Sequence, residues 1–286
     1  MKNVLVVSNF NAGRKKAVKY KKTVHKFLLA NTDSFKFISV DELNNQNMTL
    51  FDTVFVMGGD GTINKVLPFL GDKTLGIIPC GTANLLTAKL GIPDNINKAV
   101  KVIKQGYITP VDIMNVNGKP CILRCGIGYD SNIICHTPQS LKNKFGYFAY
   151  FAAGILFALR LKNKEYGIEY DNKEISINAS CIIIANAANM FRNIFAVGNK
   201  SKLDDGLFEV FILKTQNPIL FFIEFLLILL NIRHNSSRAA YFKANNIYLK
   251  AKYFKYHIDG EAGSAKDKLS CKFSTDNVKI FSKNVS

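Results

Sequence analysis

The feature that most constrains the fold is a short apolar segment that runs directly into a glycine-rich turn. Residues 53–57 form a β-branched-rich run, which is typical of a strand buried on both faces of a parallel sheet. The turn after it contains Gly58, Gly59 and Gly61, which lack a Cβ and let the backbone lie close to a ligand. A helix is expected to begin at Ile63, and its free N–H groups would point the same way. The segment therefore predicts a phosphate-binding turn.

Asp60 lies in the middle of this turn. A carboxylate beside a phosphate is repelled unless a divalent cation or a substrate hydroxyl lies between them. A role in phosphoryl transfer follows as a hypothesis. The simpler interpretation is an ordinary tight turn, because short glycine motifs often occur by chance.

Two further segments repeat the pattern of a strand followed by a turn. Residues 74–79 read as a strand, which is followed by the turn at 80–84 and by a helix with apolar residues at helical spacing. Near the N-terminus, a strand at 4–7 leads into the turn at 9–13 and a helix whose outer face is rich in lysine. Such a lysine face is usually only solvated, with a membrane or phosphate role as the alternative. Three turns at one sheet edge favour a ligand site over a chance motif.

The order of the elements predicts two domains. Strands and helices alternate over residues 1–107, which indicates a doubly wound α/β domain with ligands at the carboxyl ends of its strands. From residue 108 the predicted elements are mostly strands joined by turns: a strand at 108–116 and hairpins centred on 117–118 and 171–172. Only residues 145–161 and 218–232 have a helical pattern. Residues 108–286 are therefore expected to form an antiparallel β-sandwich. The active cleft is expected between the two domains, and the C-terminal end of the chain is a candidate to pack back on the first domain.

Composition restricts the partners. The chain has 38 Lys and Arg against 21 Asp and Glu, a net charge of +17, which favours nucleotides, anionic membranes or nucleic acid. No nucleic-acid-binding motif is present, so a nucleic acid partner is not expected. The apolar segment 218–232 is predicted to be a buried or amphipathic helix, with a helix at the membrane interface, or less readily a membrane span, as alternatives.

The cysteines and the N-terminus indicate the compartment. Six cysteines occur without a C-x-x-C pair and are expected to be small buried hydrophobes in a reducing cytosol. The N-terminus has only four consecutive apolar residues, too few for a signal peptide, so a cytoplasmic location is expected.

These motifs together resemble the bacterial diacylglycerol kinase and sphingosine kinase family of lipid kinases. The resemblance rests on G-G-D-G-T at 58–62 and P-C-G-T-A-N at 79–84, whereas NAD kinases share the first motif only. Segments at 126–130, 144–150, 204–207 and 259–261 follow in the order that the family has them, so that the resemblance covers essentially the whole chain. The turn at 9–13 resembles the family's N-P-x-x-G nucleotide loop, with Phe10 in place of proline.

The resemblance and the chemistry of phosphoryl transfer together assign a candidate nucleotide site. Backbone N–H groups and hydroxyls of the glycine turns would hold the phosphates of ATP. The candidate residues are Asn9, Phe10, Asn11, Ala12, Gly13, Gly58, Gly59, Asp60, Gly61, Thr62, Ile63, Asn64, Lys65, Gly81, Thr82 and Asn84.

The remaining candidates are acids. Asp60 and Asp112 are expected near a magnesium ion, with water between them and the ion, although Asp112 also fits an ordinary strand entry. Asp205, with the carbonyl groups of Lys202 and Leu207, resembles the family's structural magnesium site.

The Asp-Gly-Glu segment at 259–261 supplies the expected base. By its match to the family's motif, Glu261 is the expected proton acceptor, assisted by Asp60 in catalysis and supported by Asp259. An ordinary hairpin is the simpler interpretation of this segment.

Three positions depart from the family pattern. Lys65 stands where the family has a glutamate, Leu85 follows Asn84 where the closest diacylglycerol kinases have an acidic residue, and residues 189–193 contain no glycine where the family is glycine-rich.

The leading prediction is an ATP- and magnesium-dependent kinase for a lipid hydroxyl, most plausibly that of diacylglycerol. It would associate peripherally with an anionic membrane surface, and a homodimer is left open. An NAD kinase-like enzyme and a non-catalytic binder of lipid or nucleotide are the alternatives.

Overall fold

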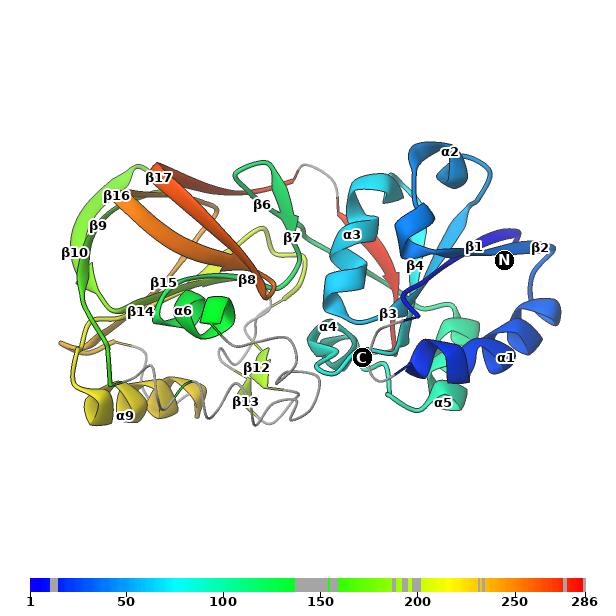
Figure 1. Cartoon of the computed structure of the whole chain (residues 1–286), viewed down its shortest axis with the longest axis horizontal. Coiled ribbons are helices and arrows are strands. Elements are labelled where there is room, and N and C mark those ends of the chain that lie inside the picture. The colour runs from blue at the N-terminus through cyan, green and yellow to red at the C-terminus, as the bar shows by residue number, and fades with distance from the viewer. Residues whose placement is uncertain are drawn as a thin grey trace. The chain divides into compact units, whose positions relative to one another are not determined.

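The computed structural model describes residues 1–10, 15–136, 154, 159–186, 189–191, 195–196, 202–230, 232, 235–274 and 277–284. The chain divides into two compact units, one of residues 1–111 and 276–286 and the other of residues 112–275 (Figure 1). The first unit includes the strand β5 (Ile108–Val111), so the division falls after Val111 and not after residue 107. The family segment at 144–150 lies outside the described residues, as does most of the predicted helix at 145–161.

The first unit is a six-stranded sheet with the order β2-β1-β3-β4-β18-β5. Its strands are β1 (Asn3–Ser8), β2 (Ser34–Ser39), β3 (Thr53–Gly58), β4 (Thr74–Pro79), β18 (Val278–Phe281) and β5. All pairs are parallel except β18 with β5. Every residue of β3 is buried, as expected for a strand covered on both faces.

Helices join the parallel strands of this unit. They are α1 (Lys16–Leu29), α2 (Asn45–Met48), α3 (Asp60–Leu70), α4 (Leu85–Lys89) and α5 (Ile96–Gln105), with a 3₁₀ turn at Val40–Glu42. Apolar residues of α1 and α5 pack with those of β1 and β3 in one buried cluster. The predicted doubly wound plan is confirmed: strand order reverses between β1 and β3, and ligands of such sheets bind at the carboxyl ends of the strands at this switch point.

The second unit is an antiparallel sheet of ten strands. They are β6 (Met114–Val116), β7 (Lys119–Cys121), β8 (Arg124–Gly128), β9 (Lys164–Tyr170), β10 (Lys173–Ala179), β11 (Cys181–Ala185), β14 (Phe208–Leu213), β15 (Ala239–Ala244), β16 (Asn246–Ile258) and β17 (Glu261–Phe273). A separate pair is formed by β12 (Asn189–Phe191) and β13 (Phe195–Ala196), and the helices are α6 (Tyr129–His136) and α9 (Pro218–Leu229).

The sheet folds into two facing layers because one strand belongs to both. The first half of β16 pairs with β9, its last residues pair with β8, and the register shifts between Ala251 and Phe254. Such a bulge allows a strand to turn the corner between two layers. Two ring stacks join strands that are not neighbours in the sheet: Phe208 with Phe273 at 4.1 Å and Tyr170 with Phe242 at 4.1 Å between centroids. The predicted antiparallel sandwich is therefore confirmed, with its core between the layers.

Three sequence-based expectations for the elements were wrong. The expected strand at 108–116 is two strands in different units, because β5 pairs with β18 whereas β6 pairs with β17. Helix α6 was not expected at 129–136. Helix α3 begins at Asp60 and not at Ile63, because the carbonyl of Gly59 already accepts the N–H groups of Thr62 and Ile63.

The cysteines behave as small hydrophobic residues. The described thiols of Cys80, Cys121, Cys125, Cys181 and Cys271 are buried and free. Burial raises the pKa of Cys80 to about 12 although Lys16 lies nearby, so that this thiol stays protonated and unreactive. In the part of the chain that is described, no helix is both long and apolar enough to cross a bilayer.

The place of β18 in the first sheet can be tested with Ile280, which is fully buried between β4 and β5. Ile280→Ala is expected to lower the free energy of unfolding by roughly 2–4 kcal/mol, because it removes buried methyl groups and leaves a cavity. Lys279→Ala, at the exposed neighbouring position, is the control and should have almost no effect. Urea unfolding measures both, and equal effects would contradict the position of β18.

Candidate functional site

The predicted turns of the first unit meet at the carboxyl ends of β1, β3 and β4. The N–H of Asn9 donates to the carbonyl of Met57 at 3.0 Å, and its Nδ2 donates to Oγ1 of Thr62 at 3.2 Å. The end of β1 is therefore joined to the start of α3 across the switch point. Phe10 packs on the cluster under α1, with the ammonium of Lys21 5.7 Å from its ring. Asn11, Ala12 and Gly13 lie outside the described residues.

The two glycine turns touch through their backbones. A Cβ added to Gly81 would lie 2.5 Å from Cα of Gly59 and 2.6 Å from Oδ1 of Asn84, and one added to Gly59 would lie 2.9 Å from Cα of Gly81. The carbonyl of Gly58 accepts the N–H groups of Cys80 and Gly81 at 2.8 and 3.2 Å. Glycine is therefore required at both positions by close backbone approach, and neither has a positive φ.

Asp60 has a structural partner that the sequence analysis did not anticipate. Its carboxylate accepts the N–H of Leu85 at 3.0 Å and that of Leu86 at 3.2 Å, so it caps the N-terminus of α4. A negative charge is favourable at this end of a helix. One acid from the first turn thus holds the helix that follows the second turn, and the N-terminus of α4 is occupied by protein.

Asn84 has an unusual environment. It is buried with φ 49°, and its Nδ2 donates to the carbonyl of Gly81 at 3.2 Å and to Oδ1 of Asp94 at 3.0 Å. Its Oδ1 is buried and has no hydrogen-bond partner among the described residues. Of the other predicted residues here, Thr62 and Ile63 are buried, Asn64 is half-buried, and Lys65 and Thr82 are exposed.

In the second unit, the turn between β16 and β17 is held by its first acid. Asp259, at φ 49°, accepts the N–H groups of Ile122, Leu123 and Arg124 at 2.7, 3.0 and 2.7 Å. Its own N–H donates to the carbonyl of Arg124 at 3.0 Å. Asp259 is therefore an anchor, while Glu261 begins β17 with an exposed side chain.

A buried network of Arg124, Asp130 and His257 adjoins this turn. His257 is fully buried, its Nε2 lies 2.7 Å from Oδ2 of Asp130, and its Nδ1 accepts the N–H of Gly260 at 3.3 Å. Because Nδ1 accepts, the ring proton lies on Nε2 and is donated to Asp130. The guanidinium of Arg124 lies 3.4 Å from the same carboxyl oxygen. His257 thus supports the backbone from which Glu261 projects.

This network requires Gly126 and stabilises an ionised carboxylate. A Cβ on Gly126 would lie 2.2 Å from Oδ2 of Asp130 and 2.3 Å from Nε2 of His257. Burial by itself would raise the pKa of Asp130, but the charge of Arg124 and the hydrogen bond from His257 hold that pKa well below its ordinary value.

The predicted metal residues lie around the turn before β14. The N–H of Asp112 donates to the carbonyl of Leu203 at 2.7 Å, and Oδ2 of Asp112 accepts the N–H of Gly206 at 2.8 Å. Burial, and next the charges of Asp204 and Asp205, raise the pKa of Asp112, although the hydrogen bond from Gly206 opposes them. The carboxyl groups of Asp204 and Asp205 in this turn therefore lie near enough to Asp112 to act on its charge.

The same turn is partly satisfied by protein groups. Oδ1 of Asp205 accepts the N–H of Leu207 at 3.2 Å, and its Oδ2 lies 3.6 Å from the ammonium of Lys243. Lys202, whose carbonyl was predicted as a ligand, is exposed at the start of this turn. Across the described ranges, no three His, Cys, Asp or Glu side chains are placed to hold one metal ion.

The structure therefore brings the predicted residues together in separate groups. In the first unit, Asn9, the turn at 58–65 and the turn at 81–84 are in contact. In the second unit, Asp112 lies with the turn at 202–207, and Asp259 lies beside Glu261. Sequence reasoning assigned no role to Asp130 or to His257. One sequence feature could have pointed to His257: it stands between Tyr256 and Ile258 in an apolar strand segment, directly before the 258–261 turn.

Comparisons with known proteins agree with this architecture. Residues 3–116 match the model of the diacylglycerol kinase catalytic domain. A diacylglycerol kinase of Bacillus subtilis is 34% identical over 222 residues, which are 74% of this chain and 72% of the relative. A solved structure of a diacylglycerol kinase from Bacillus anthracis is 21% identical, with a TM-score of 0.75 over 99% of this chain and 97% of that one.

A more distant structure shares the fold alone. An NAD kinase from Archaeoglobus fulgidus, solved in complex with ATP, is 13% identical, with a TM-score of 0.58 over 99% of this chain and 94% of that one. The two-unit fold described above is thus shared with both of these solved structures. The sequence identity to the Bacillus subtilis enzyme shows more than a shared fold: the chain belongs to the diacylglycerol kinase family.

The contact between the glycine turns can be tested with two alanine substitutions. Gly81→Ala places a methyl group against the backbone of Gly59 and is expected to lower the free energy of unfolding by about 1–3 kcal/mol. Gly61→Ala is the control: its Cβ would meet no atom within 4 Å, and alanine favours the helix that contains it. Thermal unfolding compares the two. Equal melting temperatures would contradict the backbone contact.

The charged network predicts a pH dependence of stability. Because the pKa of Asp130 is lowered from 3.8, its carboxylate stabilises the folded state above that pH, and this contribution is lost as the pH falls. Asp130→Asn is therefore expected to be less stable than the wild type by roughly 1–3 kcal/mol at neutral pH. The difference should shrink as the pH falls below 3.8. Urea unfolding between pH 7 and about pH 3 measures it.

Asp267→Asn, at an exposed position of β17, is the control for this measurement. A difference between Asp130→Asn and the wild type that stays constant over the whole range would contradict the lowered pKa of Asp130.

Proposed function

We propose that the protein is an ATP- and magnesium-dependent kinase that phosphorylates a lipid hydroxyl, with diacylglycerol as the leading acceptor. The observation that carries the proposal is the joined pair of glycine turns at the switch point of a parallel sheet. Close backbone approach at this position, together with the N-terminus of α3, suits the phosphates of a nucleotide. Membership of the diacylglycerol kinase family supports the choice of the acceptor.

The first unit would bind the nucleotide. Backbone N–H groups of Gly59, Gly61 and Thr82 would donate to phosphate oxygens, and Asn9 with Thr62 would fix the neighbouring loop. The buried Oδ1 of Asn84, which has no partner among the described residues, is an acceptor at the same edge. Asp60 would contribute chiefly by holding α4 in place, because both of its oxygens accept N–H groups from that helix.

The second unit would supply the proton acceptor. Glu261 is exposed at the start of β17. The turn before it is fixed by the hydrogen bonds of Asp259 to Ile122 and of His257 to Gly260. A carboxylate fixed in this way can accept the proton of a substrate hydroxyl as the oxygen attacks phosphorus.

The magnesium ion of the proposal would bind at the acids of the second unit. Asp112 is hydrogen-bonded to the turn that contains Asp204 and Asp205, and the charges of these two acids contribute to the raised pKa of Asp112. When bound there, with the carbonyl groups of Lys202 and Leu207 as further oxygen donors, a magnesium ion would neutralise these carboxylates. The chain's own contribution is to hold the turn, through Leu203 and Gly206, in the conformation that collects these oxygens.

Membrane association belongs to the same proposal. The acceptor lipid resides in a bilayer, and a net charge of +17 favours a surface of anionic lipid. The protein would therefore act while peripherally bound, as expected from the sequence.

The proposal is tested by assaying purified protein with ATP and magnesium against diacylglycerol, sphingoid bases, ceramide and NAD. Phosphorylation of diacylglycerol is expected. Glu261→Gln should lower kcat by about 100-fold or more without changing nucleotide affinity, because it removes the general base and nothing from the first unit. Glu174→Gln, an exposed acid on β10, is the control and should retain full activity.

Two outcomes would overturn the proposal, and a third would change its mechanism. Phosphorylation of NAD alone would favour the NAD kinase-like alternative, whose fold this chain shares. Nucleotide binding without turnover in either the wild type or Glu261→Gln would favour a non-catalytic binder, which Lys65 and the glycine-free segment 189–193 suggested. Full activity of Glu261→Gln would remove this residue from the mechanism.

A further inference from the structure

A buried asparagine lies between the two groups of candidate residues in the second unit. Asn186 follows the last residue of β11 and is only 1% exposed. Its Nδ2 donates to the carbonyl of Asp112 at 2.6 Å and, more weakly, to that of Ile122 at 3.5 Å. Its backbone N–H donates to the carbonyl of Leu123 at 2.9 Å. Asn186 thus joins the first residue of this unit to the segment that precedes β8.

On one side, Asn186 holds the acid that is predicted to lie near a magnesium ion. The N–H of Asp112 donates to the carbonyl of Leu203, and Oδ2 of Asp112 accepts the N–H of Gly206. With the bond from Asn186, the N–H, the carbonyl and the carboxylate of Asp112 each have a partner. Asp112 is therefore fixed both to Asn186 and to the turn at 202–207.

On the other side, Asn186 holds the backbone to which the 258–261 turn is attached. The carbonyl groups of Ile122 and Leu123 accept from Asn186, while their N–H groups donate to the carboxylate of Asp259 at 2.7 and 3.0 Å. These two residues are thus bound by Asn186 and by Asp259 at once. Charge-assisted bonds of this kind fix the backbone in one conformation.

The strand register places these groups at one end of the sheet. Ala185 pairs with the first residue of β8, the second residue of β8 pairs with Ile258 of β16, and Ile258 pairs with Glu261 of β17. Neighbouring strands are about 4.8 Å apart, so Asn186 and Glu261 are separated by about 14 Å of sheet. Asn186 can therefore act on Glu261 only through the backbone between them.

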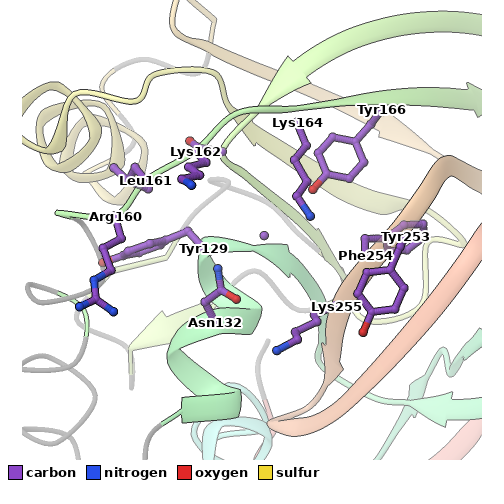
Figure 2. Close-up of a pocket in the computed structure, with 12 residues that line it drawn as sticks. Tyr129, Asn132, Arg160, Leu161, Lys162, Lys164, Tyr166, Tyr253, Phe254 and Lys255 are labelled. Carbon is purple, nitrogen blue, oxygen red and sulfur yellow. The ribbon is translucent and has the colours of Figure 1, made fainter.

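The cavity of the second unit lies at the opposite end of the same strands (Figure 2). Its volume is about 310 Å³, and its lining includes Gly128, the last residue of β8, and Ser180, which directly precedes β11. Asn186 follows the other end of β11. The hydrogen bonds of Asn186 therefore do not serve this cavity.

The amide of Asn186 is oriented by acceptors alone. Both groups near Nδ2 are carbonyl oxygens, so the NH₂ group must face them and Oδ1 must point away. Oδ1 is buried and has no hydrogen-bond partner within the part of the chain that is described. A buried oxygen without a donor lowers stability. Such a cost is typical of residues that serve function and not folding alone.

We propose that Asn186 is a positioning residue for the phosphoryl transfer, because its amide fixes Asp112 relative to the turn that carries Glu261. Its catalytic consequence rests on the proposed function, in which Glu261 accepts a proton and Asp112 lies near magnesium. A displacement of about 1 Å in such an arrangement can lower a rate by about 100-fold. Asn186 itself takes no part in the proton transfer.

Amide hydrogen exchange tests the link without an assay of activity. In Asn186→Ala, residues 203–207 should exchange about 10-fold faster, because Asp112 no longer has the bond that fixes its carbonyl. Asn186→Asp keeps the size of the side chain but has no donor, and should show at least the same increase. The control is Ile182→Val in the buried middle of β11, which loses stability without touching either turn.

Kinetics test the consequence for catalysis. Asn186→Ala should lower kcat by about 10-fold or more and leave KM for ATP unchanged, because the proposed nucleotide residues belong to the first unit. In the background of Glu261→Gln, the same exchange should lower kcat by less than about 3-fold, since an absent base cannot be misplaced. Ile182→Val should change neither kcat nor KM.

Either of two results would exclude the positioning role. One is unchanged exchange of residues 203–207 in both Asn186 variants. The other is a loss of kcat in Asn186→Ala that equals the loss in Ile182→Val or multiplies fully with the loss in Glu261→Gln.

Failure of the proposed function would look different. A wild-type protein that phosphorylates no lipid would refute the kinase proposal, whereas the exchange of residues 203–207 would still decide whether Asn186 holds Asp112 and its turn. An active wild type with additive variants would refute only the role of Asn186.

Discussion

The first unit depends on a backbone contact that side chains would prevent. The turns after β3 and β4 approach until Gly59 and Gly81 touch, and the carbonyl of Gly58 accepts two N–H groups from the second turn. Such an approach needs two adjacent parallel strands of matched length, with a glycine one residue after β3 and two residues after β4. Asp60 then joins α3 to α4 with its carboxylate. The two turns are therefore held together by protein groups alone, which reduces the ordering that binding a ligand would otherwise require.

A common theme of both units is that acids serve as acceptors for backbone N–H groups. Asp60 caps α4, Asp112 accepts from Gly206, and Asp259 accepts from three successive residues. All three stand in motifs where a sequence suggests catalysis or metal binding. Charge-assisted hydrogen bonds of this kind are stronger than neutral ones and fix a turn in one conformation. Glu261, the proposed proton acceptor, differs because its side chain is exposed and can be reached by a substrate.

The second unit depends on a buried charged pair. Next to the 258–261 turn, Asp130 and His257 form a buried hydrogen-bonded pair. The pair lies so close to the backbone of Gly126 that no side chain fits at that position. On the same unit, helix α9 packs through Phe221 on Tyr129, the first residue of α6, whose next residue is Asp130.

Local sequence determined the parts whose physics is local. Apolar β-branched runs predicted β1, β3 and β4, glycine placed the turns, and Asn117 with Gly118 marked a hairpin, because each of these signals acts within a few residues. Tertiary structure decided the rest. The polar segment 261–273 is a strand only because β16 pairs with it, residues 108–116 divide because their partners lie in different sheets, and His257 acquires its role from an aspartate 127 residues away. Pairing partners, burial and charge neighbours depend on residues distant along the chain, and no short pattern can specify them.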